Sequence, residues 1–286
     1  MATLKVIRKR ISSIRNTQQI TKAMKMVSAA KLRRAQEAAV EARPYADKMA
    51  DLLKNLSSRV SRAAHPLLTT REEKRIQLVL VTSDRGLCGG YNANLIRAAE
   101  AFIRSQGAGK EITLSFVGRK GADYYRRRRG EGGDRYTNFL SMAPEDLAEE
   151  IAAKLTSLFV DGQTDAVYLL YSHFRSALSQ VPTLEKILPV ALNDTEETDQ
   201  LTEYLYEPGV EELLSSLLPK ITEIKIQRAL LEATASEHGA RMTAMDSATT
   251  NASKMMGSLT LQMNRARQAS ITRELMEIVG TAEALK

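Results

Sequence analysis

The stretch SDRGLCGGYN, residues 83–92, is the part of the sequence whose composition best suits ligand chemistry. It follows the apolar run IQLVLVT at 76–82 and precedes a helical pattern, and such a strand–turn–helix order often binds phosphate through backbone N–H groups. The spacing does not match, because no Lys-Ser or Lys-Thr follows Gly90, and Gly86, Gly89 and Gly90 do not form G-x-G-x-x-G. A structural turn is the favoured interpretation. A nucleotide-binding α/β enzyme that uses this loop is one alternative.

The other residue types that commonly perform chemistry are sparse and scattered. Cys88 is the single cysteine, so no disulfide can form within the chain, and a small buried core residue in a reducing compartment is favoured. The three histidines, His65, His173 and His238, lack the spacing of metal ligands. No Ser/His/Asp arrangement or carboxylate pair stands out. The sequence therefore predicts no catalytic residue, no metal and no cofactor.

Charge is distributed unevenly along the chain, whose formal net charge is +7. Between Lys5 and Arg34 every charged residue is basic, and the first acidic residue is Glu37. Such a surface suits an acidic protein, nucleic acid or anionic lipid. A second basic run, YYRRRRG at 124–130, lacks a nucleic-acid motif and is more typical of a solvated helix end. A basic coiled-coil protein that binds nucleic acid is the second alternative, although we expect no nucleic-acid partner.

Composition favours helix over sheet. Aromatic residues make up 5% of the 286 residues and Trp is absent, while Ala, Leu, Met, Lys, Arg and Glu fill long stretches. No apolar run reaches about 18 residues, so no transmembrane helix is expected. The basic N-terminus continues into a helical pattern without a cleavage signal, so we expect the mature chain to begin near Met1 without a transit peptide.

Two segments carry the spacing of a coiled-coil seam. Residues 4–60 contain no glycine and only one proline, Pro44, at which we expect a bend. Alternating steps of four and three meet apolar or small residues at both ends of this segment and polar ones between positions 18 and 28. A second seam follows EPG at 207–209 and slips in phase after Ala266. The first seam comprises Ile7, Ile11, Ile14, Gln18, Thr21, Lys25, Ser28, Leu32, Ala35, Ala39, Ala42, Ala46, Met49, Leu53, Leu56 and Val60, and the second Ile221, Ile224, Arg228, Leu231, Ala235, His238, Met242, Met245, Thr249, Ala252, Met256, Leu259, Met263 and Ala266.

Length determines how these helices must pack. They would be about 80 and 110 Å long, whereas a compact middle domain is only about 36 Å across, so they must pair with each other, antiparallel. Position n on the first helix then faces roughly 272 minus n on the second, and the polar positions 18–28 face the polar residues 241–253. The C-terminal end is left as a lone helix about 25 Å long. Its large apolar residues predict a partner with an apolar sleeve; they are Ile271, Leu275, Ile278 and Leu285.

The middle of the chain reads as α/β, with a mostly parallel sheet and flanking helices. We expect strands at 76–82, 112–118, 166–172 and near 181–190, and helices at 92–106, 119–128 and 144–160. The predicted organisation is an N-terminal coiled-coil helix at 1–62, an α/β domain at 63–207 and a C-terminal coiled-coil helix at 208–286 that packs with the first as one shaft.

Four long blocks closely resemble the γ subunit of F-type ATP synthase. They are residues 7–36 (IRKRISSIRNTQQITKAMKMVSAAKLRRAQ), SDRGLCGGYN at 83–92, YLYEP at 204–208, and the region from ARMTAMDSATTNA at 240 to 285. The resemblance implies a rotor shaft that stands inside a ring of α and β subunits, with its C-terminal tip in an apolar bearing. The globular part, together with the ε subunit, would stand on the c-ring, so that proton flow turns the shaft and drives the catalytic β subunits through their nucleotide states.

The resemblance also implies partner contacts for individual residues. Met24 and Lys25 would couple the shaft to β and face Arg241 and Thr243 across the coil, and Arg241 would also bind the αβ head. The RARQASIT block would contact a β loop through Arg267, Gln268 and Thr272, with Glu274 and Glu277 in the same block. The foot on the c-ring would be formed by Tyr204, Tyr206 and Glu207.

The resemblance further implies a location for the chain. A non-catalytic subunit of this kind would be peripheral, on the cytoplasmic face of the bacterial inner membrane. A processed organelle form is the alternative. The regulatory cysteine pair of the plastid members is missing, so no redox control through a disulfide is expected.

Overall fold

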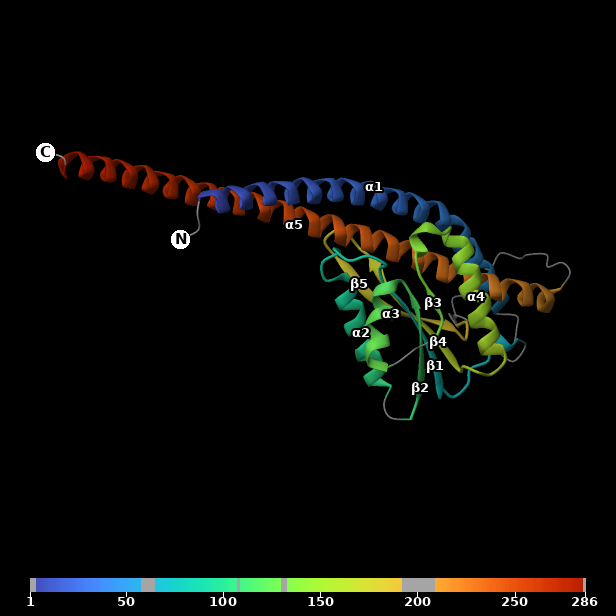
Figure 1. Cartoon of the computed structure of the whole chain (residues 1–286). Coiled ribbons are helices and arrows are strands. Elements are labelled where there is room, and N and C mark those ends of the chain that lie inside the picture. The colour runs from blue at the N-terminus through green and yellow to red at the C-terminus, as the bar shows by residue number, and fades with distance from the viewer. Residues whose placement is uncertain (1–3, 58–64, 107–108, 130–132, 192–208, 285–286) are drawn as a thin grey trace. The chain divides into compact units, whose positions relative to one another are not determined.

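The computed structural model describes residues 4–57, 65–106, 109–129, 133–191 and 209–284 (Figure 1). Two compact units are formed by Met1–Ser28 with Met242–Lys286 and by Ala29–Arg241. The domain limits expected near 62 and 207 lie outside the described residues.

The second unit is built on a five-stranded sheet in the order β3-β2-β1-β4-β5. Its strands are β1 (Arg75–Val81), β2 (Glu111–Val117), β3 (Arg135–Tyr136), β4 (Ala166–Phe174) and β5 (Gln180–Leu188). All neighbours are parallel except β4 and β5, which form an antiparallel pair. The four predicted strands are therefore confirmed to within two residues. The two-residue strand β3 was not predicted, because so short a segment carries no period-two pattern.

Helices cover both faces of this sheet (Figure 1). Helices α2 (Tyr91–Ser105) and α3 (Arg119–Arg129) share one core cluster with the β1 residues Ile76, Leu78 and Leu80. Helix α4 (Pro144–Val160) and parts of the two long helices share the other cluster with Val79 and Val81. This alternation along β1 is the period-two pattern of a strand that is buried on both faces.

The two long helices are α1 (Leu4–Ser57) and α5 (Val210–Ala284), and Pro44 lies inside α1 without ending it. On α1, every predicted seam position from Ile7 to Leu53 is buried or half-buried. On α5 the same holds from Ile221 to Ala266, except that Arg228 is exposed. The Arg228 guanidinium Nε lies 3.1 Å from the Glu232 carboxylate on the same helix. The side chains of Leu56 and Val60 are outside the described set.

Polar contacts in the first unit confirm antiparallel pairing in the expected register. Thr21 and Thr249 are joined through their hydroxyl groups at 2.8 Å, and Gln18 donates to Ser253. Lys25 donates to Asp246. These partners sum to 270 or 271, against the 272 that was expected. The two polar segments therefore do face each other.

The C-terminal end of α5 presents apolar side chains to solvent, as the sequence predicted. Ile271, Leu275 and Ile278 are 49%, 56% and 64% exposed, and Val279 is exposed beside them. Leu285, the last residue of the predicted tip, lies outside the described residues. In the described part of the chain, no helix is long and apolar enough to cross a membrane.

Candidate functional site

The glycine-rich stretch lies at the place where α/β sheets of this order bind ligands. The chain leaves β1 toward β2 on one side and returns to β4 on the other, so the strand order reverses between β1 and β4. Crevices for nucleotides form at the carboxyl ends of strands at such a reversal. The loop that follows β1 contains Ser83 to Gly90 and leads directly into α2.

Helix α5 covers this end of the sheet with its own residues. The Tyr91 hydroxyl donates to the backbone carbonyl of Ala233 at 3.2 Å, and the Ser236 hydroxyl donates to that of Ser172, at the end of β4, at 2.8 Å. Gly239 lies so close to β4 that an added Cβ would meet the Phe174 ring at 3.0 Å. The position that a nucleotide would take in a related fold is therefore filled by α5.

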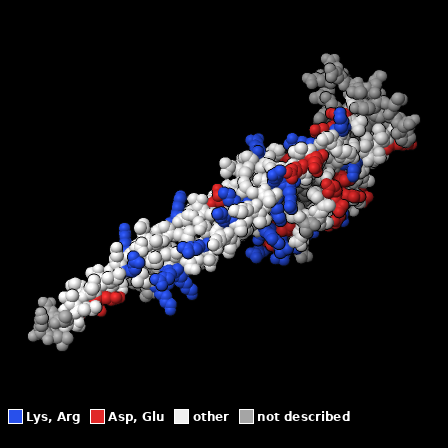
Figure 2. All heavy atoms as spheres, turned by 90° about the horizontal axis from the view of Figure 1, so that it is seen from above, with Lys and Arg blue, Asp and Glu red and all other residues white. Residues whose placement is uncertain are grey.

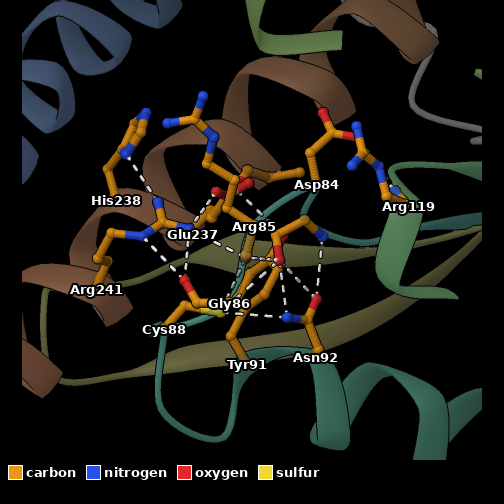
Figure 3. Close-up of polar contacts among 12 residues, drawn as sticks. Asp84, Arg85, Gly86, Cys88, Tyr91, Asn92, Arg119, Glu237, His238 and Arg241 are labelled. Atoms are coloured by element: carbon orange, nitrogen blue, oxygen red, sulfur yellow. Dashed lines mark hydrogen bonds and ion pairs between the residues drawn. The ribbon is translucent and has the colours of Figure 1, made fainter. Parts of the chain in front are cut away.

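Arg241 fixes the loop to α5 (Figure 3). Its guanidinium donates to the backbone carbonyls of Arg85 and Gly86, both at 3.3 Å, and to the Glu237 carboxylate at 2.7 Å. A phosphate cradle presents N–H groups to an anion, whereas this loop presents carbonyls to a cation. The polarity of the loop is thus opposite to that of a phosphate site.

Polar side chains in the loop and at the start of α2 form hydrogen bonds with one another. The Asn92 amide accepts from the Ser83 backbone N–H at 3.0 Å and donates to the Ser83 hydroxyl at 2.7 Å. Asn92 also donates to the Cys88 sulfur at 3.2 Å. Leu87 and Gly89 have φ of 64° and 58°, the left-handed region, where glycine is favoured and Leu87 is strained. The glycine at 89 therefore serves the turn, as the sequence predicted.

Burial shapes the electrostatics of the pair formed by Glu237 and Arg241. Their side chains are 1% and 10% exposed. Burial raises the pKa of Glu237, and the adjacent guanidinium opposes that rise. Glu237 Oε2 accepts no hydrogen bond from any described residue. The carboxylate is thus held mainly by Arg241, and loss of either partner would leave a buried group unpaired.

His238 completes the cluster as a neutral imidazole. Burial lowers its pKa to about 4, and the nearby charges of Arg241 and Lys31 contribute. Its Nδ1 lies 3.4 Å from the Arg241 guanidinium, a geometry in which a neutral ring accepts. An imidazolium here would lose this hydrogen bond and repel both cations.

The remaining candidates for chemistry do not form a reaction centre among the described residues. Cys88 is buried, as predicted, and burial raises the pKa of its thiol, which disfavours the reactive thiolate. His173 contacts Glu232, and His65 accepts from the Leu67 backbone N–H. In the described part of the chain, His, Cys, Asp and Glu form no group of three suited to a metal ion.

The basic character predicted for α1 is visible on the molecular surface. Figure 2 shows Lys and Arg side chains recurring over the helical part with few acidic ones among them, while acidic side chains gather elsewhere. In the run at 124–130, Tyr125 is buried, Arg126 pairs with Asp123, and Arg128 lies over the Tyr124 ring at 4.0 Å. This arrangement fits the solvated helix end that the sequence favoured.

One predicted pairing across the coil is corrected. Lys25 was expected to face Arg241 and Thr243, but it donates to Asp246. The guanidinium of Arg241 instead contacts residues of its own unit, Glu237 and the loop after β1. The expected register of about 272 already placed position 25 near 247, and the contact of Lys25 lies five residues beyond Arg241, more than one helical turn.

The other residues predicted to bind partners differ in exposure. Met24 is half-buried in the seam region. Arg267, Gln268, Thr272, Glu274 and Glu277 are all exposed on α5 and accessible to a partner. The predicted foot residues Tyr204, Tyr206 and Glu207 lie outside the described residues.

Sequence reasoning missed the residues that attach α5 to the loop. Glu237, Ser236 and Tyr91 were not among the candidates. One signal was available, because Glu237 and Arg241 stand four residues apart in the stretch ATASEHGAR, which is otherwise small and weakly polar. An i, i+4 ion pair on a buried helix face predicts a polar contact with another element.

Comparison with known proteins identifies the family. A family model described as ATP synthase matches residues 3–285. The ATP synthase gamma chain of Geobacter metallireducens is 53% identical, and that of Moorella thermoacetica 49% identical, in both cases over the whole of each chain.

Solved structures are similar as well. A chain from the central stalk and c-ring of the Tetrahymena thermophila mitochondrial ATP synthase has a TM-score of 0.61 at 26% identity, covering 80% of this chain and 99% of that one. A chain of the Euglena gracilis mitochondrial ATP synthase shares the fold, with a TM-score of 0.69 at 21% identity over 99% and 94% of the two chains. The matches over nearly the whole length show that the chain belongs to the family of ATP synthase gamma chains.

Proposed function

We propose that this chain is the central-stalk rotor of a proton-translocating F-type ATP synthase and has no catalytic site of its own. It couples rotation of the c-ring to the conformational cycle of the catalytic β subunits. The observation that carries the proposal is the antiparallel coil, with paired seams along its length and an apolar tip whose side chains are exposed to solvent. Such a tip needs a partner, because each exposed large side chain forgoes about 1.5–3 kcal/mol of burial.

The contact with the αβ head would be made by the two helices of the first unit. Met24, Lys25 and the exposed block from Arg267 to Glu277 would meet the head, and Ile271, Leu275 and Ile278 would turn in an apolar bearing. Individual exposed ion pairs contribute only about 0–1 kcal/mol. Many weak contacts suit a surface that must slide past its partner while it turns.

The opposite end would stand on the membrane sector. We assign contact with the c-ring to Tyr204, Tyr206 and Glu207 and contact with the ε subunit to the α/β part. The chain would then be peripheral to the membrane, on the cytoplasmic face of the bacterial inner membrane. The α subunits, β subunits, ε subunit and c-ring would be its partners.

Single-molecule rotation tests this proposal. An αβ head carrying the chain is fixed to a surface, and a bead is attached through Arg127→Cys, an exposed position on α3, in a Cys88→Ser background. ATP should turn the bead in one direction, and omission of ATP is the control. A head that does not bind the chain, or a bead that stays still while ATP is hydrolysed, would refute the rotor function. Saturable micromolar binding of ATP to the isolated chain would instead support a nucleotide-binding enzyme.

A further inference from the structure

The contact between α5 and the sheet is mostly apolar, and near the loop after β1 the residues of α5 are small. Between Leu214 and Ala240, buried apolar residues of α5 join the two core clusters. The stretch 233–240 is dominated by small residues, among them Ala233, Ala235 and Gly239. Apolar burial is not directional, so within this small-residue stretch hydrogen bonds fix the orientation of the helix more specifically than the packing does. The large buried apolar side chains that α5 adds to the core clusters lie before this stretch, from Leu214 to Leu230.

Hydrogen bonds at the same place fix the orientation of α5 about its own axis. The Tyr91 hydroxyl, at the start of α2, makes one neutral hydrogen bond to α5, and the Ser236 hydroxyl of α5 makes another to β4. Arg241 makes the charged contact, because its guanidinium reaches two successive carbonyls of the loop. Hydrogen bonds with a charged partner are about twice as strong as neutral ones. Arg241 is also the last residue of the second unit on α5.

Glu237 determines where the Arg241 guanidinium points. Its carboxylate lies one helical turn before Arg241, is almost fully buried, and has no other hydrogen-bond donor among the described residues. The planar guanidinium can therefore donate to Glu237 from one edge and to the loop carbonyls through the same or a neighbouring N–H. Without Glu237 the long Arg241 side chain would keep its charge but lose its fixed orientation.

We propose that Glu237, Arg241 and the carbonyls of Arg85 and Gly86 form a clamp that transmits torque between the α/β fold and helix α5. Arg241 makes the contact, and Glu237 is a positioning residue that acts through it. This inference rests on the proposed rotor function. Without the clamp, the stretch of α5 next to the loop would twist more easily against the α/β part, so more ATP would be hydrolysed for each proton pumped.

The test uses membrane vesicles that contain the assembled ATP synthase with the variant chain. Arg241→Gln removes the charged contact. We expect futile hydrolysis, measured as ATP consumed without proton pumping, to rise about tenfold. Loss of one charged hydrogen bond shifts an equilibrium by about that factor. Glu237→Ala should act in the same direction, and Glu237→Gln, which keeps an acceptor for Arg241, should restore most of the coupling. Asp165→Asn is the matched control, because it removes a buried carboxylate at the far end of β4.

The outcomes separate the two proposals. A parent chain that is missing from the assembled complex would contradict the rotor function itself. Complexes with Arg241→Gln that pump as many protons per ATP as the parent, or that are as well coupled as Asp165→Asn complexes, would overturn the clamp. If Arg241→Gln prevents assembly, Glu237→Ala decides, because it leaves Arg241 in place but removes the carboxylate that orients it. Increased futile hydrolysis in this variant supports the clamp, and parental coupling overturns it.

Discussion

The neutral His238 imidazole makes the stability of this chain depend on pH in a defined window. Its pKa is about 4 in the folded chain, against 6.5 for an ordinary histidine. Below 6.5 the unfolded chain therefore binds a proton that the folded chain excludes, and the free energy of unfolding falls until the pH reaches about 4. At about 1.36 kcal/mol per pKa unit, the loss amounts to about 3 kcal/mol.

The substitution His238→Gln isolates this effect. The amide oxygen of the introduced glutamine can accept from Arg241 but does not titrate, so the variant should lack this part of the acid destabilisation. Urea unfolding of the full chain, followed by circular dichroism from neutral pH down to about 4, gives the free energy of unfolding for both proteins. The difference between parent and variant should change by about 3 kcal/mol across the window, in favour of the variant in acid. Parallel curves would show that His238 is not held neutral and would refute the reasoning.

Three further expectations concern other parts of the molecule. Phe159→Ala empties a fully buried site on α4 and should cost about 3–5 kcal/mol in urea unfolding; a loss below about 1 kcal/mol would contradict the packing. Asp165→Asn weakens contacts to the backbone N–H groups of Lys74 and Arg75 and should cost about 1–3 kcal/mol, a loss that should shrink in acid, since hydrogen bonds with Arg75 lower the pKa of Asp165. Ile271→Ser combined with Leu275→Ser should leave the stability of the free chain within about 0.5 kcal/mol but weaken its binding to an αβ ring, which pull-down titration measures. Unchanged binding would show that the apolar tip does not form the bearing contact.

Local pattern was sufficient for the elements and for the pairing of the helices. In β1, the alternation of Leu78 and Leu80 with Val79 and Val81 distributes side chains to two core clusters, and a run buried on both faces is typical of a central parallel strand. In the coil, the seam positions and the lengths of the helices together predicted the register to within two residues, as the contact of Thr21 with Thr249 demonstrates. Both predictions depend on the regular spacing of apolar residues within a single segment.

The attachment of α5 to the loop could not be predicted in this way. Arg241 is separated by 156 residues from Arg85 and Tyr91 by 142 from Ala233. No period links such positions, and Arg241 has the same residue type whether it meets a partner subunit or its own backbone. The family resemblance had assigned Arg241 to the αβ head, while the fold buries its charge against Glu237 and two carbonyls.

The glycine-rich loop shows why position in a fold does not determine what binds there. The reversal of strand order predicts a crevice after β1, and the turn has the backbone freedom that a ligand site needs, with Gly89 at positive φ. Here the crevice is filled by helix α5 of the same chain, and the Arg241 guanidinium on this helix donates to carbonyl groups of the loop. A site that releases a nucleotide must be open, whereas a rotor gains from one that is permanently filled, because the filling helix is then joined to the sheet by directional bonds. The same architecture can therefore carry force once its own helix replaces the ligand.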